Sequence, residues 1–336
     1  MKALIVAPAW IGDTIMAQPL FARLRARQPG LRLDALAPRW VAPVLQRMDD
    51  IAEIIDSPFK HGELSLKARW RLGRELAARD YAAVYVLPNS LKSALVPFLA
   101  GIPRRVGFTG EARYGLINLR HTLDEAALPL MIERFMQLAE PPGTPPEKPI
   151  APPRLRSTAA DQARTLGELA IEKPPRIVAF CPGAEYGPAK RWPAAHFAVL
   201  AQALAAQGRA VWLFGSAKDQ AVAEEISRLA PGCCRNLCGG TSLGQAVDLL
   251  ALAELVVCND SGLMHVAAAL DRPIVALYGS SSPGFTPPLS GQADILSLRL
   301  PCSPCFERQC PLGHLDCLNL LTPQQVLAAI EKRSPA

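Results

Sequence analysis

The chain has 336 residues, half of them hydrophobic and a fifth charged, which is typical of a globular protein and excludes a disordered one. This length favours two domains over one. No apolar run reaches the roughly 18 residues of a membrane-spanning helix, and the apolar start Met1–Pro8 is too short for a signal peptide. The nine cysteines are an odd number, and most lie in apolar surroundings, which argues against a disulfide framework and indicates a reducing, cytoplasmic setting.

The net charge of +6 is unevenly distributed, because the stretch from Lys60 to Arg120 holds eleven Lys or Arg and only four Asp or Glu. A basic surface on the first half of the chain would attract anionic lipid, an acidic substrate or nucleic acid. For any single residue a solvated helix face is the simpler interpretation. We expect no nucleic acid as a partner, since the chain has no nucleic-acid motif and almost no aromatic residues among these cations.

Strands and helices alternate along the first half of the chain, which predicts a parallel sheet wrapped by helices. Apolar and β-branched runs predict strands at 3–7, 31–37, 53–56, 81–87 and 105–108. Helical periodicity predicts helices at 12–27, 42–48, 66–79, 90–101 and 128–139. The proline-rich stretch 141–153 then predicts a stiff linker that separates a domain of residues 1–153 from one of residues 154–322.

A second α/β series follows the linker. It predicts strands at 177–181, 210–214, 255–258 and 274–278, and helices at 158–169, 194–207, 219–229, 242–251 and 323–332. The expected α/β fold therefore has two doubly wound domains with a cleft between them. Ligands of such sheets bind outside the carboxyl ends of the strands.

The stretch Leu255–Leu270 combines a buried strand, a tight turn at 259–262 and an alanine-rich helix. The N–H groups at a helix N-terminus attract anions, so this turn is a candidate phosphate site. Asp260 or Ser261 can cap the helix, and His265 lies one turn beyond Ser261 on the same face. An ordinary capped helix with a buried histidine is the alternative, and the turn alone does not decide between the two.

Three further segments that follow strands carry polar residues. Residues 8–14 contain one glycine instead of the G-x-G-x-x-G that a dinucleotide needs, which argues against a dehydrogenase. Asp13 in this segment either suits the dipole of a helix start or serves as a general base. The glycine- and proline-rich loop 182–193 offers Lys190 to a phosphate. Asp219 either accepts hydrogen bonds from ribose hydroxyls or caps the next helix.

In this order the segments resemble the heptosyltransferases of glycosyltransferase family 9, through Gly-Asp near the N-terminus, Pro-Gly…Lys-Arg-Trp-Pro, Phe-Gly-Ser…Asp and Asn-Asp-Ser-Gly-x-x-His. The resemblance covers nearly the whole chain. It implies the GT-B fold, with two Rossmann-like domains facing each other across a cleft and a closing helix, 323–332, that packs back on the first domain. It also implies transfer of heptose from ADP-L-glycero-β-D-manno-heptose to the inner core of lipopolysaccharide, with inversion at the anomeric carbon.

The resemblance implies a role for each matching residue. Asp13 would be the general base, Lys190 would meet the donor phosphates, Thr241 would lie at the adenine, and Asp219 falls near an acidic position that meets the ribose. The diphosphate and the sugar would lie on a turn whose matching residues are Asp260, Ser261, Gly262 and His265. No cofactor and no catalytic Mg²⁺ are expected, because GT-B enzymes meet the leaving-group charge with cations and helix N–H groups.

The implied acceptor is an anionic lipid A core at the inner face of the inner membrane. The cations of the first half of the chain would attract it. Loose candidates for contacting it are Lys92, Arg104, Arg105 and Arg120. We therefore expect a cytoplasmic enzyme that is peripheral to the membrane. Two other classes stay open: another GT-B enzyme, such as a nucleotide-sugar epimerase, and a non-catalytic nucleotide-sugar-binding protein.

The tail holds four cysteines whose spacing matches zinc ligands only in the first pair: Cys302, Cys305, Cys310 and Cys317. This tail is similar to that of one branch of the family. A small structural zinc site, buried adaptable thiols and a redox-labile pair are all open interpretations.

Overall fold

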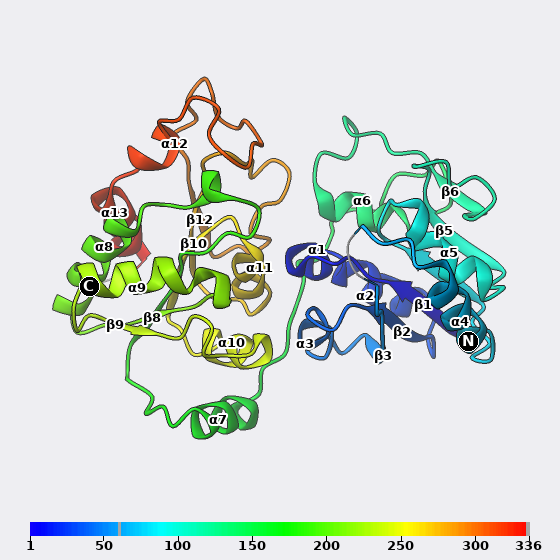
Figure 1. Ribbon diagram of the computed structural model, residues 1–336, viewed down its shortest axis with the longest axis horizontal. Helices are drawn as coiled ribbons and strands as arrows, with labels where there is room; N and C mark the ends of the chain where they lie inside the picture. Colours follow the sequence, from blue (N-terminus) through cyan, green and yellow to red (C-terminus); the bar gives the residue numbers. More distant parts are fainter. Residues whose placement is uncertain (60–61, 334–336) are drawn as a thin grey trace. The chain divides into compact units, whose positions relative to one another are not determined.

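The computed structural model describes residues 1–59 and 62–333, and the chain forms two compact units (Figure 1). The first unit covers Met1–Pro153 and the second begins at Arg154. Each unit is built on one six-stranded sheet. No helix within the described ranges is long and apolar enough to cross a membrane.

The sheet of the first unit has the strand order β3-β2-β1-β4-β5-β6, and its neighbouring strands all run parallel. The chain moves outward from β1 in one direction, returns to β4 and moves outward in the other, which is the doubly wound arrangement. The strands are β1 (Lys2–Val6), β2 (Arg32–Ala37), β3 (Ile51–Asp56), β4 (Ala83–Val86), β5 (Arg104–Phe108) and β6 (Leu119–His121).

Right-handed crossovers place the helices of the first unit on the two faces of its sheet, so that α4 and α5 share one face. The helices are α1 (Ile11–Met16), α2 (Gln18–Arg27), α3 (Ala42–Leu45), α4 (Leu66–Ala77), α5 (Leu91–Leu99) and α6 (Met131–Gln137). The single helix predicted at 12–27 is in fact two, because Pro19 has no N–H to donate to the preceding turn.

The second unit repeats this topology with the order β12-β11-β10-β7-β8-β9. Its strands are β7 (Ile177–Cys181), β8 (Ala210–Leu213), β9 (Cys234–Asn236), β10 (Leu255–Asn259), β11 (Ile274–Leu277) and β12 (Ala293–Leu296). Its helices are α7 (Ala159–Glu168), α8 (Ala194–Ala206), α9 (Gln220–Leu229), α10 (Leu243–Leu250), α11 (Gly262–Ala269), α12 (Asp316–Asn319) and α13 (Pro323–Arg333), with 3₁₀ turns η1 (Pro188–Lys190) and η2 (Ala217–Asp219).

The closing helix α13 packs within the second unit. It contacts α8 and β11, and Val326 and Ile330 are buried in the core that these elements share. The chain is already held just before the helix, because Trp192 Nε1 donates to the carbonyl of Leu321 at 2.7 Å. The apolar face of α13 is therefore used inside this unit.

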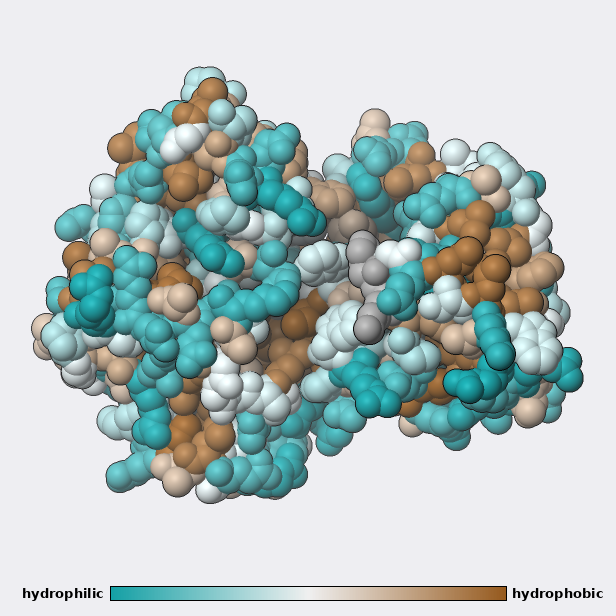
Figure 2. All heavy atoms as spheres, viewed as in Figure 1, coloured by the Kyte–Doolittle hydropathy of each residue, from teal (hydrophilic) through white to brown (hydrophobic). Residues whose placement is uncertain are grey.

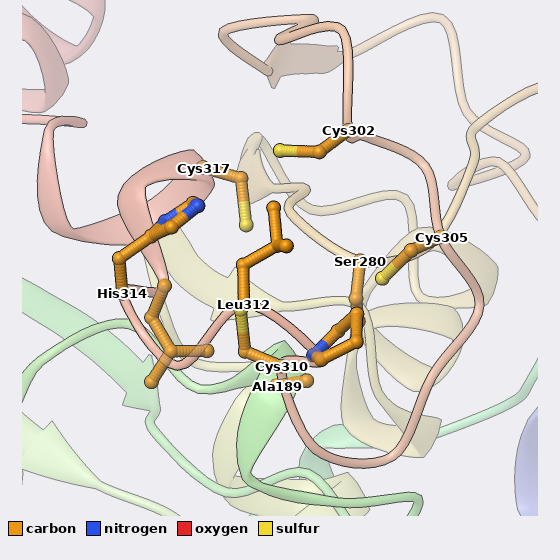
Figure 3. A pocket seen from close by; sticks show the side chains of 10 residues that line it. Ala189, Ser280, Cys302, Cys305, Cys310, Leu312, His314 and Cys317 are labelled. Atoms are coloured by element: carbon orange, nitrogen blue, oxygen red, sulfur yellow. The ribbon is translucent and has the colours of Figure 1, made fainter.

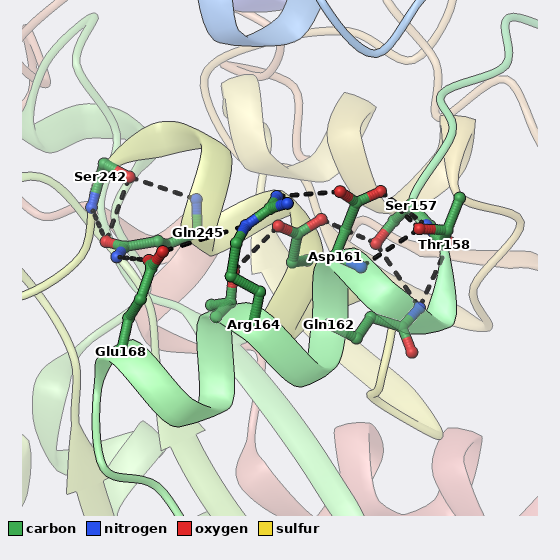
Figure 4. Close-up of polar contacts among 10 residues, drawn as sticks. Ser157, Thr158, Asp161, Gln162, Arg164, Glu168, Ser242 and Gln245 are labelled. Atoms are coloured by element: carbon green, nitrogen blue, oxygen red, sulfur yellow. Dashed lines mark hydrogen bonds and ion pairs between the residues drawn. The ribbon is translucent and has the colours of Figure 1, made fainter.

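Polar side-chain contacts join α7 to α10 (Figure 4), and one buried carboxylate takes part in them. Asp248 is 1% exposed and accepts hydrogen bonds from Ser157 Oγ at 2.8 Å and Thr165 Oγ1 at 3.0 Å. Nearer the start of α10, Gln245 Nε2 donates to Glu168 at 3.1 Å. These contacts fix the position of α10 and of the segment that leads into it.

Three strands that the sequence did not predict all lie at sheet edges. These are β6, β9 and β12, with the short sequences Leu-Arg-His, Cys-Arg-Asn and Ala-Asp-Ile-Leu. Edge strands are commonly short and polar, so they lack the buried apolar run by which the central strands were recognised.

Candidate functional site

Each sheet has one place where the winding direction reverses, between β1 and β4 in the first unit and between β7 and β10 in the second. Ligands of doubly wound sheets bind at such points, outside the carboxyl ends of the strands. Asp13 comes after β1, Lys190 comes after β7 and Asp260 comes after β10. The predicted catalytic and phosphate-binding residues therefore follow the strands that flank these points.

Lys190 and Asp260 form an ion pair at the switch point of the second unit. Lys190 Nζ lies 2.6 Å from Asp260 Oδ2, and their side chains are 17% and 5% exposed. Asn259, which is fully buried, holds the loop that carries Lys190: its amide donates to Pro182 O at 2.7 Å and accepts from Trp192 N at 3.1 Å. Asn259 was not among the predicted site residues, although a lone amide at the end of an apolar strand is the signal for it.

Four buried polar atoms at this edge of the sheet have no hydrogen-bond partner among the described residues. They follow β10 and β11 and are Ser261 Oγ, His265 Nδ1, Ser280 Oγ and Ser281 Oγ. A buried polar group without a partner costs about 1–3 kcal/mol, so the set indicates a polar ligand. Ser280 and Ser281 were not predicted, but three consecutive serines after a buried strand could have indicated them.

The predicted cap of α11 differs from the structure. Ser261 occupies the N-cap position with extended backbone, yet among the described residues its side chain makes no capping hydrogen bond. Its hydroxyl therefore stays available at the helix start, beside the first residue Gly262. The pKa of His265 is lowered to about 4, chiefly by burial, with Asp260 opposing the shift and Lys190 adding to it. The imidazole is consequently neutral near pH 7.

Residues 306–308 of the tail form hydrogen bonds with the loop that carries Lys190. Tyr186 donates its hydroxyl to Phe306 O at 2.7 Å, and Ala189 N donates to Arg308 O at 3.1 Å. Two cations lie over the ring of Tyr186: Lys190 Nζ is 5.0 Å from the ring centroid, and the Arg308 guanidinium carbon is 5.2 Å from it. This contact between loop and tail was not predicted from the sequence.

The four tail cysteines line one small pocket together with Ala189 and Ser280 (Figure 3). Leu312 lies among the thiols in that view. Within residues 1–59 and 62–333 no group of three or more His, Cys, Asp or Glu side chains is arranged to hold a metal ion, and the nine cysteines are free thiols. Of the four tail thiols only that of Cys317 is buried, whereas Cys302 is exposed.

Asp13 is a half-buried residue in the first turn of α1. The segment before it is fixed by two contacts: Thr14 Oγ1 donates to Trp10 O at 2.9 Å, and Trp40 Nε1 donates to Ala9 O at 2.8 Å. The carboxylate therefore has a defined place at the carboxyl edge of the first sheet.

Asp219 and Thr241 lie after β8 and before α10. Asp219 Oδ2 accepts from Ser216 N and Ser216 Oγ, both at 2.9 Å, and so caps η2 instead of α9. Glycine at 183 leaves room for this carboxylate, since a Cβ there would lie 2.3 Å from Asp219 Oδ1. Thr241 is half-buried and donates to Leu237 O at 3.4 Å.

The four candidate acceptor residues do not form one group. Lys92 lies in the first turn of α5, at the same sheet edge as Asp13, whereas Arg104 and Arg105 begin β5 and lie at the opposite edge. Arg105 also donates to the carbonyls of Ile102 at 2.6 Å and Leu116 at 2.7 Å. Arg120, on β6, lies 5.6 Å from the ring centroid of Tyr114. The structure thus associates only Lys92 with the edge of Asp13.

Comparison with known proteins identifies the family. The family model "Glycosyltransferase family 9 (heptosyltransferase)" matches residues 69–316. The chain is 46% identical to lipopolysaccharide heptosyltransferase 2 of Escherichia coli K12 over 97% of both chains. It is also 46% identical to lipooligosaccharide heptosyltransferase 2 of Haemophilus influenzae over 89% of both.

A solved structure confirms the expected GT-B-type α/β fold and the branch that the tail indicated. It is that of E. coli ADP-heptose lps heptosyltransferase II, which matches with a TM-score of 0.90 and 43% identity, over 99% of this chain and 98% of that one. The chain belongs to glycosyltransferase family 9, the heptosyltransferases.

Proposed function

We propose that this protein is an inverting glycosyltransferase that moves L-glycero-D-manno-heptose from ADP-heptose to the heptose of heptosyl-Kdo2-lipid A in the inner core of lipopolysaccharide. The observation that carries the proposal is the Lys190–Asp260 pair at the switch point of the second unit, with four buried polar atoms that await a ligand at the same edge. The relatives that are called heptosyltransferase 2 support the choice of substrates.

The second unit would bind the donor and stabilise the leaving group. An ammonium has three N–H donors, and Asp260 accepts from Lys190 Nζ along one direction, so Lys190 can also donate to the diphosphate. The first N–H groups of α11 and the hydroxyls of Ser261, Ser280 and Ser281 supply further donors. We assign Thr241 to the adenine and Asp219 to the ribose end of the donor.

The first unit would supply the base. As the acceptor oxygen attacks the anomeric carbon, Asp13 takes its proton, the bond from carbon to the phosphate oxygen breaks and ADP leaves with the electron pair. Attack from the side opposite ADP gives inversion. Negative charge grows on the leaving phosphate during this step, so donors already directed at it stabilise the transition state more than the ground state.

The acceptor is anchored by its lipid, and none of the helices that the structure describes can cross a membrane. We therefore place the enzyme at the cytoplasmic face of the inner membrane as a peripheral protein. Lys92, at the edge of Asp13, is the cation that we assign to the anionic acceptor.

The test is Asp13→Asn, which keeps the shape of the side chain and removes the base. Transfer of heptose to purified acceptor should fall by about 10²-fold or more, while the Kd for ADP-heptose, measured by calorimetry, should change less than about threefold. Asp80→Asn is the matched control, because Asp80 is exposed and precedes β4, at the opposite sheet edge.

Transfer that survives in Asp13→Asn at more than about a tenth of the wild-type rate contradicts the assignment of the base. An epimerase would convert ADP-heptose without any acceptor, and a binding protein would turn over neither substrate. Acceptors that lack the first heptose, or already carry the second, distinguish this activity from those of heptosyltransferases I and III.

A further inference from the structure

One face of the first unit exposes several large apolar side chains on two neighbouring helices. Leu66 and Trp70 are both 57% exposed and lie one turn apart on α4, with Leu64 48% exposed just before that helix. On α5, Phe98 is 45% exposed and continues a stripe from the half-buried Leu91 and Leu95. We call these residues, with the cations between them, the α4–α5 face.

The two helices form one continuous surface. Gly73 allows them to approach closely, since a Cβ at this position would lie 2.7 Å from Leu99 Cβ. Arg69, which is 5% exposed, donates to Leu64 O at 2.6 Å and to Lys92 O at 2.9 Å. Figure 2 shows hydrophobic side chains gathered over α5, with hydrophilic ones beside them.

The charge of the α4–α5 face indicates what would cover it. Lys67, Arg71 and Arg74 are exposed on α4, and the carboxylate of Glu75 lies 3.9 Å from Arg71. A helix with Trp and Leu beside Lys and Arg is typical of elements that lie in the interface of an anionic bilayer. A second copy of the chain is a poor occupant, because two such faces would bring like charges together.

The topology gives this face a position relative to the chemistry. In the parallel sheet, α4 begins after β3 and α5 begins after β4, so both helices start at the carboxyl edge, where Asp13 also lies. Leu64, Leu66 and Lys67 are at that end of the face. A bilayer on this face would bring its headgroups to the edge that carries the proposed base.

We propose that the α4–α5 face docks the enzyme on the anionic lipid surface that holds its acceptor. Trp70 and Leu66 enter the interface, and Lys67 and Arg71 attract the lipid phosphates. The link to catalysis rests on the proposed function, because only a heptosyltransferase with a lipid acceptor needs this orientation. The docking itself does not depend on the acceptor, so the two can be tested separately.

The first experiment measures binding of the full chain to vesicles that contain no acceptor, either pure phosphatidylcholine or phosphatidylcholine with about a third phosphatidylglycerol. Wild type should sediment with the anionic vesicles at low salt and release as salt shortens the Debye length. Leu66→Ser with Trp70→Ser, and separately Lys67→Glu with Arg71→Glu, should each reduce the partition coefficient roughly tenfold or more.

Matched controls lie in the second unit. Val199→Ser with Leu320→Ser removes two exposed apolar side chains, and Lys173→Glu with Arg228→Glu changes two exposed cations by the same net charge. Both controls should bind as wild type does. Equal loss in the controls, unchanged binding in the α4–α5 variants, or equal wild-type binding to neutral vesicles overturns the proposal.

The second experiment compares transfer to acceptor embedded in vesicles with transfer to deacylated, water-soluble acceptor. On the embedded acceptor, the kcat/KM of the α4–α5 variants should fall roughly tenfold, in parallel with their partition coefficient for the vesicles. On the soluble acceptor, it should stay within about twofold of the wild-type value. Equal losses on both acceptors would mean that these residues contact the sugar, and a loss of binding that accompanies a change of oligomeric state would mean a second copy; either overturns docking. Failure of the proposed function would instead appear as no transfer by wild type to either acceptor.

Discussion

The ion pair between Lys190 and Asp260 gives a stability prediction that can be calculated from the structure. Lys190→Met keeps most of the stem and removes the cation, which leaves the carboxylate of Asp260, 5% exposed, without its counter-ion at 2.6 Å. Breaking a buried pair from one side costs about 3–5 kcal/mol. Because Lys190 is 17% exposed and water can enter from that side, we expect a loss of about 2–3 kcal/mol.

The reverse substitution should cost less. Asp260→Asn keeps the shape of the side chain, and the flexible stem of Lys190 can turn its ammonium to water, so we expect a loss of about 1 kcal/mol. The double variant has neither the stranded carboxylate nor the stranded ammonium. Its loss should therefore be smaller than the sum of the two single losses by about 1–3 kcal/mol.

Urea unfolding without ADP-heptose measures these values through tryptophan fluorescence. The two buried tryptophans, Trp192 and Trp212, are 1% and 2% exposed and belong to the second unit, whereas Trp10, Trp40 and Trp70 are already 50–57% exposed. The change in signal therefore reports mainly the unit that contains the pair. If the single losses add to within about 0.5 kcal/mol of the double loss, the two side chains are not coupled and the reasoning fails.

Two further predictions concern the same unit. His265 has its pKa lowered by burial to about 4, while in the unfolded chain it takes up a proton near pH 6.5. The free energy of unfolding should therefore fall as pH drops from about 6.5 to 4, by at most roughly 3 kcal/mol. In urea titrations at several pH values the slope should be shallower in His265→Gln and unchanged in the exposed His314→Gln. Gly187→Ala places a Cβ 2.4 Å from Arg308 O and should cost about 1–3 kcal/mol and weaken ADP-heptose binding. Gly167→Ala, which meets nothing within 4 Å, should do neither, and equal effects of the two would contradict the role of this contact.

The central strands could be predicted because burial on both faces makes each one an apolar run. The strands β1, β7 and β10 read Lys-Ala-Leu-Ile-Val, Ile-Val-Ala-Phe-Cys and Leu-Val-Val-Cys-Asn. Three of the four edge strands, β6, β9 and β12, lack such a run and take their conformation from the neighbouring strand, which a local pattern does not contain. Pro19 could have indicated that the helix predicted at 12–27 divides into two, because proline has no N–H to donate to the preceding turn.

Candidate site residues can be chosen from the sequence where a topological rule applies. Once alternating strands and helices imply doubly wound sheets, polar residues at the carboxyl ends of central strands become candidates, and this places Asp13, Lys190 and Asp260. The rule does not say which of them pair. The contact between Lys190 and Asp260 joins residues 70 positions apart, and Asn259 was expected only as part of the turn, not as the buried amide that holds the Lys190 loop.

The tail shows most clearly where a sequence pattern and the structural cause differ. Its cysteine spacing left a zinc site, adaptable thiols and a redox-labile pair open, whereas the tail meets the Lys190 loop through main-chain carbonyls, those of Phe306 and Arg308. A carbonyl is present whatever side chain occupies the position, so no residue pattern can reveal it. The sequence signal of such a contact lies in the Lys190 loop, where the close approach of a tail carbonyl requires a residue without a Cβ. Gly187 is that residue, because a Cβ at this position would lie 2.4 Å from Arg308 O. It lies three residues before Lys190, which the contact holds in position.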